Sequence, residues 1–262
     1  MKNLSRKISK IFQPQQSKRG EAQKNRICDD DVFLVSYPKS GNTWIRFIIA
    51  NLVKSNPDEE IDFYSVARYI PELGVHDHFL AELPKPRIIK SHQLFNEYFK
   101  SVVYIIRDPR DVYVSYYHYL KRRLPSNQNF SDFLREKTLF PSRWHSHVQS
   151  WVDTPNVKHL LRYEDLLVDP ESEIIRLLNS LDGKMSFTIA EIKEAIKKSS
   201  FSNMKEIEQK KGRYFLNGDA RKIATPFVRK GTHGDWKNYF SKSDEEFLLK
   251  EAGDLMYRFK YI

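Results

Sequence analysis

The sequence predicts one α/β domain with a central parallel sheet, on two observations. Apolar runs of strand length recur along the chain and are bounded by turn residues, which is typical of strands buried on both faces. They lie at residues 32–36, 87–90, 102–106 and 157–161. Segments with helical spacing alternate with these runs, as in α/β folds. A chain of 262 residues can bury one sizeable core, so a single domain is the default.

The first apolar run leads through a short loop into a helix. Pro38, Gly41 and Asn42 interrupt the apolar pattern. From Ile45, apolar residues recur at i, i+3, i+4 and i+7, which places them on one helical face. The N-terminus of such a helix presents unpaired N–H groups and the positive end of a dipole, and both favour an anion.

The side chains of this loop suit the same ligand. Lys39 adds a full charge, Ser40 and Thr43 add hydroxyl donors, and Gly41 lets the backbone come close. We therefore expect a phosphate or sulfate group here; an ordinary strand-to-helix turn with a surface lysine is the alternative. The loop is not a nucleoside-triphosphate P-loop, because the pattern G-x-x-x-x-G-K-[ST] is absent.

A second basic residue, Arg107, stands at the corresponding place after the third apolar run. Arginine is suited to bidentate phosphate binding. Ser115, one helical turn beyond Asp111, can point back to the same anion. For Asp108, Arg110 and Asp111 we expect mutual ion pairing that holds the turn.

Lys90 and His92 stand at the end of the second apolar run. Ligands of parallel α/β sheets bind beyond the carboxyl ends of the strands, so both residues are candidates for chemistry, with simple strand capping as the alternative. Residues 229–236 carry two adjacent cations, two glycines and a Trp, which suits a loop closing on an anion; an ordinary basic loop is the alternative. We expect no metal site, because the His76 and His78 pair lacks a third ligand.

The ends of several helices also carry signals. Residues 131–152 are expected to form two helical segments whose aromatic residues mostly belong to the core. Three residue pairs are predicted to cap helices, namely Asp169 with Pro170, Thr188 with Glu191, and Ser243 with Glu246.

The net charge of +10 is concentrated near the N-terminus. Residues 1–26 hold eight Lys or Arg residues and one Glu, a balance of +7. The remainder is only mildly basic, so we expect no nucleic-acid partner. We predict a basic, flexible arm at residues 1–28 and one domain at residues 29–262, with weak contact of the arm with an acidic membrane surface as the alternative.

Cys28 is the only cysteine, so an internal disulfide is impossible and a reducing compartment is expected. We therefore predict the cytoplasm. The N-terminal residues do not have the apolar region of a signal peptide or a membrane span.

Several motifs resemble those of the cytosolic sulfotransferases, and they occur in the family order. Residues 37–44 (YPKSGNTW) are similar to the 5′-phosphosulfate loop of that family, and residues 104–118 (YIIRDPRDVYVSYYH) to its 3′-phosphate motif. Further matches are residues 229–238 (RKGTHGDWKN), 90–92 (KSH), 142–151 (SRWHSHVQSW) and 163–165 (YED).

The resemblance implies a fold related to nucleotide kinases, and a donor, 3′-phosphoadenosine 5′-phosphosulfate (PAPS). The family moves the sulfuryl group of PAPS to a hydroxyl or amine and needs no metal. By resemblance His92 is the general base, as suits a neutral imidazole, and Lys39 and Lys90 stabilise the transferring group. The residues implied for donor binding are Lys39, Ser40, Gly41, Asn42, Thr43, Trp44, Arg107, Ser115, Tyr163, Ser199, Ser200, Phe201, Met204, Arg229, Lys230 and Gly231.

Two departures from the family pattern matter. Asn42 stands where the family usually has a second Thr, and it keeps a hydrogen-bonding side chain. The family dimer signature K-x-x-x-T-V-x-x-x-E reads Lys237, Ser241, Lys242 and Glu246. Because an apolar Val has become Lys242, we expect this dimer contact to be absent or weak.

The acceptor cannot be named from the sequence. Aromatic residues in the segments expected around the pocket favour a small phenolic acceptor or an apolar alcohol. They include Tyr69, Phe79, Tyr117, Phe140, Trp144 and Phe215. The alternatives to an active sulfotransferase are a nucleotide kinase of related fold and a non-enzymatic nucleotide-binding protein.

Overall fold

The computed structural model describes most of the predicted domain. The described residues are 26–121, 124–181, 183, 185–212 and 226–262. The arm expected at residues 1–28 therefore lies outside the described residues, except for its last three positions.

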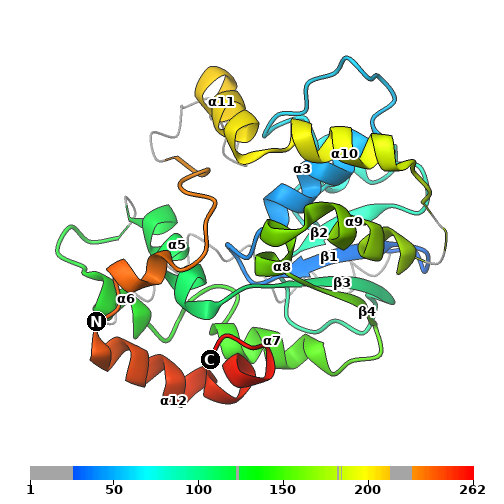
Figure 1. Cartoon of the computed structure of the whole chain (residues 1–262). Helices are drawn as coiled ribbons and strands as arrows, with labels where there is room; N and C mark the ends of the chain where they lie inside the picture. Colours follow the sequence, from blue (N-terminus) through cyan, green and yellow to red (C-terminus); the bar gives the residue numbers. More distant parts are fainter. Residues whose placement is uncertain (1–25, 122–123, 182, 184, 213–225) are drawn as a thin grey trace.

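The centre of the fold is a parallel sheet (Figure 1). Its strands in the described residues are β1 (Val32–Ser36), β2 (Ile88–Ser91), β3 (Ser101–Ile106) and β4 (Val157–Arg162), in the spatial order β2-β1-β3-β4. Every neighbouring pair is parallel. The α/β fold class is therefore confirmed, and each predicted strand lies within one residue of its expected bounds.

The register brings the carboxyl ends of the strands to one edge of the sheet. Val35 pairs with Ser91, Ser36 with Ile105, and Ile106 with Arg162. The loops that follow these strands therefore begin side by side, where parallel sheets bind their ligands.

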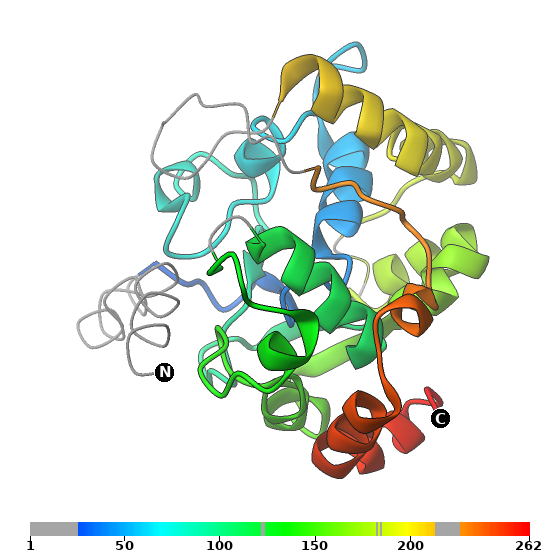
Figure 2. The ribbon, with the colours of Figure 1, turned by 90° about the vertical axis from the view of Figure 1, so that its left-hand side faces the viewer.

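Alternating residues of the strands pack on opposite faces. In β1, Phe33 and Val35 belong to one buried cluster, and Val32 and Leu34 belong to another. The first cluster takes its helical residues from α5 (Pro109–Leu120), α6 (Phe130–Leu134), α7 (Trp144–Val152) and α12 (Lys242–Arg258). The second takes them from α3 (Asn42–Val53), α4 (Val66–Tyr69), α8 (Tyr163–Val168), α9 (Pro170–Asn179), α10 (Ile189–Lys198) and α11 (Phe201–Lys211). Figure 1 shows α3 and α10 on one side of the sheet and α7 and α12 on the other, and Figure 2 gives the turned view.

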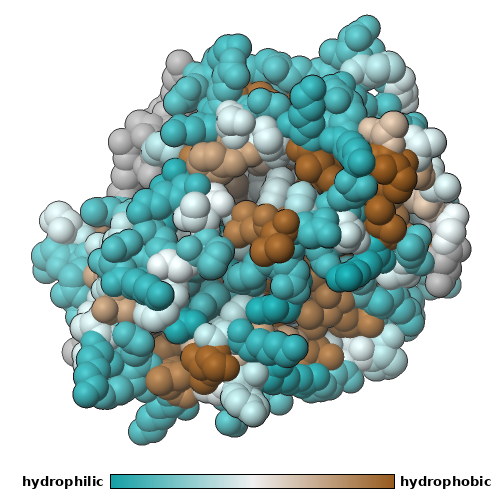
Figure 3. Space-filling model, viewed as in Figure 1, coloured by the Kyte–Doolittle hydropathy of each residue, from teal (hydrophilic) through white to brown (hydrophobic). Residues whose placement is uncertain are grey.

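Two 3₁₀ helices complete the described elements, η2 (Asp77–Phe79) and η3 (Asp235–Asn238). No helix within the described residues is long and apolar enough to cross a membrane. The face seen in Figure 3 is mostly hydrophilic, and its hydrophobic residues form separate small groups.

Two of the predicted helix caps are confirmed. Asp169 accepts a hydrogen bond from the Ser172 N–H with Pro170 at the first helical position, and Thr188 with Glu191 forms a capping box. The box expected at Ser243 and Glu246 is wrong.

The last helix instead begins with a capping box made by Ser241 and Asp244. The buried Asp244 carboxylate is also paired with Arg135 and accepts a hydrogen bond from the Ser131 hydroxyl at 2.8 Å. These contacts come from α6 and its C-terminal end, which local spacing cannot reveal.

Candidate active site

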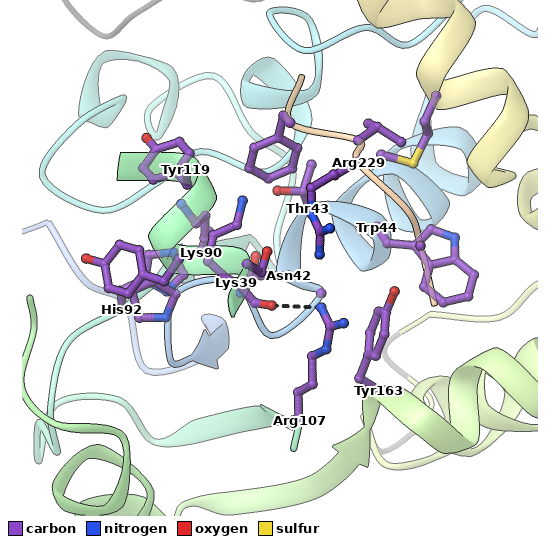
Figure 4. A pocket seen from close by; sticks show the side chains of 18 of the residues that line it. Lys39, Asn42, Thr43, Trp44, Lys90, His92, Arg107, Tyr119, Tyr163 and Arg229 are labelled. Atoms are coloured by element: carbon purple, nitrogen blue, oxygen red, sulfur yellow. Dashed lines mark hydrogen bonds between the residues drawn. The ribbon is translucent and has the colours of Figure 1, made fainter. Parts of the chain in front are cut away.

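A cavity of about 700 Å³ opens at the carboxyl edge of the sheet. Its lining comes from the carboxyl ends of the strands and the loops and helices that follow them, from Glu72, Gly74, Val75 and Phe140, from α11, and from residues 227–232. Figure 4 shows His92, Lys90 and Tyr119 toward one end and Trp44 and Tyr163 toward the other. Four strand ends and a distant loop thus contribute to one cavity.

Most of the residues predicted for the site line this cavity. They are Lys39, Gly41, Asn42, Thr43, Trp44, Lys90, His92, Arg107, Ser115, Tyr163, Phe201, Met204, Arg229, Lys230 and Gly231. Three predicted residues are not part of the lining. Ser199 is buried and its hydroxyl accepts a hydrogen bond from Asn51 Nδ2 at 3.2 Å, and Ser200 caps α11 by accepting from the Asn203 N–H. Ser40 is fully buried, and its hydroxyl has no hydrogen-bond partner among the described residues.

The loop after β1 has a left-handed backbone. Lys39 has φ 72° and Gly41 has φ 100°. A Cβ atom at Gly41 would lie 2.5 Å from the Tyr163 ring, so only glycine fits between this loop and α8. Asn42 donates hydrogen bonds to the Leu34 carbonyl oxygen at 3.1 Å and to the Ser36 hydroxyl at 3.2 Å, so its amide ties the helix start back to β1.

Lys39 extends toward aromatic residues. Its Nζ lies 3.6 Å from the centre of the Phe227 ring and 4.7 Å from that of Tyr119. Contacts of this kind stabilise a cation by about 0.5–2 kcal/mol, a range that depends on how far the cation is desolvated. The Lys39 charge therefore lies against the aromatic part of the cavity.

Arg107 joins two loops of the site. It donates hydrogen bonds to the Lys39 carbonyl oxygen at 3.2 Å, drawn in Figure 4, and to the Thr232 carbonyl oxygen at 3.0 Å. Its guanidinium carbon lies 4.2 Å from the centre of the Tyr163 ring. Its Nε–H is buried without a partner among the described residues, which leaves a donor for a ligand of the cavity.

The loop at residues 229–236 is held by two carboxylates. Asp235 pairs with Arg229 and with Lys230, both at 2.6 Å. Burial would raise the pKa of Asp235, but hydrogen bonds from Lys230 and Arg229 hold it at about 2. A Cβ at Gly231 would lie 2.2 Å from the Phe201 ring, so this loop and α11 also approach closely.

The second carboxylate is Asp111, and here the expected mutual pairing is partly wrong. Asp108 and Arg110 do pair, at 2.7 Å. Asp111 instead accepts hydrogen bonds from the backbone N–H groups of Gly234, at 2.6 Å, and Trp236, at 3.0 Å. These two hydrogen bonds tie the loop at residues 229–236 to the start of α5. The two N–H groups lie close enough to Asp111 to donate only in the folded chain.

His92 is held in one tautomer. Its Nδ1 lies 2.6 Å from the Ser36 carbonyl oxygen, which can only accept, so Nδ1 carries the proton and Nε2 of the neutral ring has its lone pair available. Burial, with the charge of Lys90, lowers the pKa of His92 to about 3. The imidazole is therefore neutral at pH 7, as a general base must be.

A second histidine supports the first. His147 is fully buried in α7, as expected of a core residue, and its Nε2 donates to the His92 carbonyl oxygen at 3.2 Å. Its Nδ1 accepts from the Tyr104 hydroxyl at 2.8 Å. Burial lowers the pKa of His147 to about 4, so this ring is also neutral at pH 7.

Glu72 is the residue of the site that sequence reasoning missed. Its carboxylate is paired with Lys90 at 2.6 Å. Burial alone would raise the pKa of Glu72, but the charges of Lys90 and His92 and the hydrogen bond from Lys90 lower it to about 2. No local motif marks Glu72, because it meets Lys90 only through long-range pairing of the backbone.

Most of the aromatic residues expected around the acceptor do not line the cavity. Tyr116, Tyr119, Phe140 and Phe227 line it. Trp144 is instead fully buried in the core, and Tyr117 packs there on Phe130 and Phe133. Tyr69 and Phe79 are not part of the lining, and Phe215 lies outside the described residues.

Within the described residues, one group has the ligand types of a metal site, Cys28, Asp30 and Asp31. Asp31 is already paired with Arg87 at 2.6 Å. None of the three lines the cavity.

Comparison with known proteins gives the family of the chain. Residues 29–260 match the family model of the sulfotransferase domain. Sulfotransferase 1 family member D1 of Mus musculus is 30% identical over 260 residues, covering 88% of this chain and 86% of the relative. Sulfotransferase 1C2 of Homo sapiens is 30% identical over 242 residues, covering 83% and 80%.

A solved structure shows the same fold. The crystal structure of mouse sulfotransferase SULT7A1, complexed with PAP, has a TM-score of 0.69 and 25% identity, covering 92% of this chain and 90% of that one. A retinol dehydratase in complex with androsterone and inactive cofactor PAP has a TM-score of 0.73 at 21% identity, covering 91% and 84%. Since the family model spans nearly the whole described chain, the protein belongs to the sulfotransferase family.

Proposed function

We propose that this protein transfers a sulfuryl group from PAPS to a hydroxyl, or an amine, of a small acceptor. The observation that carries the proposal is that one cavity holds both the basic loops at the strand ends and His92 with its Nε2 lone pair available. Transfer requires both parts, because the site must bind a charged donor and remove the proton of the acceptor in the same place.

The lining fits a nucleotide that carries several anionic groups. The loop after β1 offers the N-terminus of α3, Lys39 and Thr43 for the 5′-phosphosulfate. Arg107 and Ser115, with Arg229, Lys230 and Gly231, are proposed to bind the 3′-phosphate. The adenine is proposed to lie among Trp44, Tyr163, Phe201 and Met204, which line the same cavity.

His92 is proposed to act as the base. Its Nε2 takes the proton of the acceptor hydroxyl as the acceptor oxygen bonds to sulfur and the sulfur–oxygen bond to the 5′-phosphate breaks. Lys39 and Lys90 stabilise the charge on the sulfuryl oxygens and on the leaving phosphate. Side-chain cations here do what metal ions do in phosphoryl transfer, so we propose a reaction without a metal.

The acceptor is proposed to be phenolic or an apolar alcohol. Tyr119, Phe140 and Phe227 provide apolar area in the same cavity as His92. We further propose a cytoplasmic setting, since Cys28 is the only cysteine of the chain.

The test is calorimetric titration of 3′-phosphoadenosine 5′-phosphate (PAP) in the absence of metal. We expect tight binding by the wild type and binding about 10- to 100-fold weaker by Arg107→Ala, since charge-assisted hydrogen bonds are lost. Arg68→Ala removes an exposed arginine outside the cavity lining and should leave the affinity unchanged. Absence of PAP binding, or Mg²⁺-dependent binding of ATP in its place, would reject the proposal.

A further inference from the structure

The cavity contains one carboxylate among several cations. Among the described residues that line it, Glu72 is the only acidic one, whereas five are Lys or Arg. A negative charge opposes the binding of a sulfated and phosphorylated donor, so it weakens the site unless it serves another purpose.

The backbone holds Glu72 opposite Lys90. The Lys90 N–H donates to the Pro71 carbonyl oxygen at 2.8 Å, and the Leu73 N–H donates to the Lys90 carbonyl oxygen at 3.0 Å. These bonds form a parallel bridge between Glu72 and Lys90 on the outer edge of β2. The pairing of the two side chains is therefore built into the sheet.

A buried arginine fixes the same segment from the other side. Arg46 in α3 donates two hydrogen bonds to the Ile70 carbonyl oxygen, at 3.0 and 2.6 Å. Glu72 therefore lies two residues after Ile70, whose carbonyl oxygen is held by Arg46.

The charges around Lys90 show what the carboxylate does. Four groups face this ammonium: Glu72 and His76 from the bridged segment, Arg46 from α3, and His92 from the end of β2. Burial lowers the pKa of Lys90, Arg46 lowers it further, and Glu72 opposes both. Without Glu72, a largely buried ammonium group would have three cationic or potentially cationic neighbours, Arg46, His76 and His92, and no counter-charge.

We propose that Glu72 is a positioning residue that keeps Lys90 charged and aligned, and that stabilises the imidazolium formed when His92 takes the acceptor proton. The second part rests on the proposed function; the first part holds whatever the acceptor is. The carboxylate touches neither the proton in transfer nor the sulfuryl group in this scheme, and it acts through Lys90 and His92.

The primary test needs no acceptor. Lys90 is acetylated competitively with a dilute anhydride across a pH series, and mass spectrometry reports the pH of half-maximal labelling in wild type, Glu72→Gln and Glu82→Gln. We expect Glu72→Gln to lower this pH by about one unit or more, as loss of a close opposite charge does. Glu82→Gln, which removes an exposed carboxylate of the same segment, should match the wild type. An unchanged labelling profile in Glu72→Gln would overturn the proposal.

The kinetic test follows once an acceptor is found. Glu72→Gln should lower kcat at least about tenfold, leave the KM for PAPS unchanged or lower, and shift the alkaline limb of the kcat profile to lower pH. Glu72→Asp should restore part of kcat. PAP titration of the same variants separates this proposal from the proposed function. If the wild type does not bind PAP, PAPS is rejected as the donor, but the role of Glu72 in keeping Lys90 charged is not. Equal kcat and equal pH profiles in wild type and Glu72→Gln would reject the role in transfer.

Discussion

The Nε2 of His147 donates a hydrogen bond to the carbonyl oxygen of His92 at 3.2 Å. The proposed base is therefore held through its backbone by a buried ring on α7, as well as through its own Nδ1 by Ser36. Both contacts orient a side chain whose chemistry depends on a free Nε2.

His147→Phe should therefore slow transfer more than it weakens donor binding. We expect kcat to fall about tenfold or more, because a displacement of the base is costly even when binding is intact. The PAP affinity should stay within about twofold of the wild type. His147→Gln, which can still donate to the His92 carbonyl, should lose less. Equal turnover by His147→Phe and wild type would show that Ser36 alone positions His92.

The protein should lose stability in mild acid. The pKa of His147 is lowered to about 4 in the fold, whereas an unfolded His titrates near its ordinary 6.5. Between these values the unfolded state binds more protons, so stability is full above about pH 6.5 and falls as pH falls toward 4. At pH 5 the loss from this one residue is about 2 kcal/mol. Urea unfolding of wild type and His147→Gln at pH 7 and pH 5 measures this loss. The difference in the free energy of unfolding between the two proteins should be smaller at pH 5 than at pH 7. The same difference at both pH values would contradict the prediction.

Gly41→Ala should damage the proposed donor site. The new methyl group would combine a strained φ of 100° with a contact of 2.5 Å to the Tyr163 ring. We expect a stability loss of about 1–3 kcal/mol and weaker PAP binding, because the loop and α8 must separate. Gly183→Ala is the matched control, since Gly183 also has a positive φ, 71°, but nothing within 4 Å of the new Cβ. Equal PAP affinities in the two variants would argue against close packing as the reason for Gly41.

Asp111→Asn should weaken PAP binding without blocking folding. The amide can accept from only one side, so it cannot satisfy the N–H groups of both Gly234 and Trp236. The loop that carries Arg229 should then be less well held, and we expect an affinity loss of about tenfold. Calorimetry checks this, with the exposed Asp132→Asn as control. An unchanged affinity would mean that the loop is held by Asp235 and Arg107 alone.

The family dimer contact stays a prediction. Lys237, Ser241, Lys242 and Glu246 are all exposed, and Lys242 occupies the first position of α12. We expect no dimer through this segment in analytical ultracentrifugation, and increased self-association of Lys242→Val. A wild-type dimer cross-linked within residues 237–246 would contradict the expectation.

Local patterns were enough for the strands and for the loop after β1. The apolar runs and the turn residues that end them are short-range signals, and the parallel register then brings Lys39, Lys90 and Arg107 to one edge. The strand-end position marks His92 as a candidate, and the resemblance to the family adds its proposed role as base and the proposed donor-binding residues.

The rest depends on contacts between distant segments. Glu72 meets Lys90 through a bridge across 18 positions, and Asp111 meets Gly234 across 123 positions. Nothing in the residues next to Glu72 or Asp111 distinguishes either from an acidic residue on the surface. The last helix is capped by Ser241 with Asp244 and not, as predicted, by Ser243 with Glu246, because Asp244 is buried and paired with Arg135 of another segment.

The positions of the tryptophans have a practical consequence. The chain has four of them, and only Trp44 lines the cavity. Trp144 and Trp151 are fully shielded from solvent, and Trp236 lies 4.0 Å from the Arg110 guanidinium. The intrinsic fluorescence of Trp44 therefore offers an optical signal of cavity occupancy, free of any label, over a constant background from the two core indoles, Trp144 and Trp151.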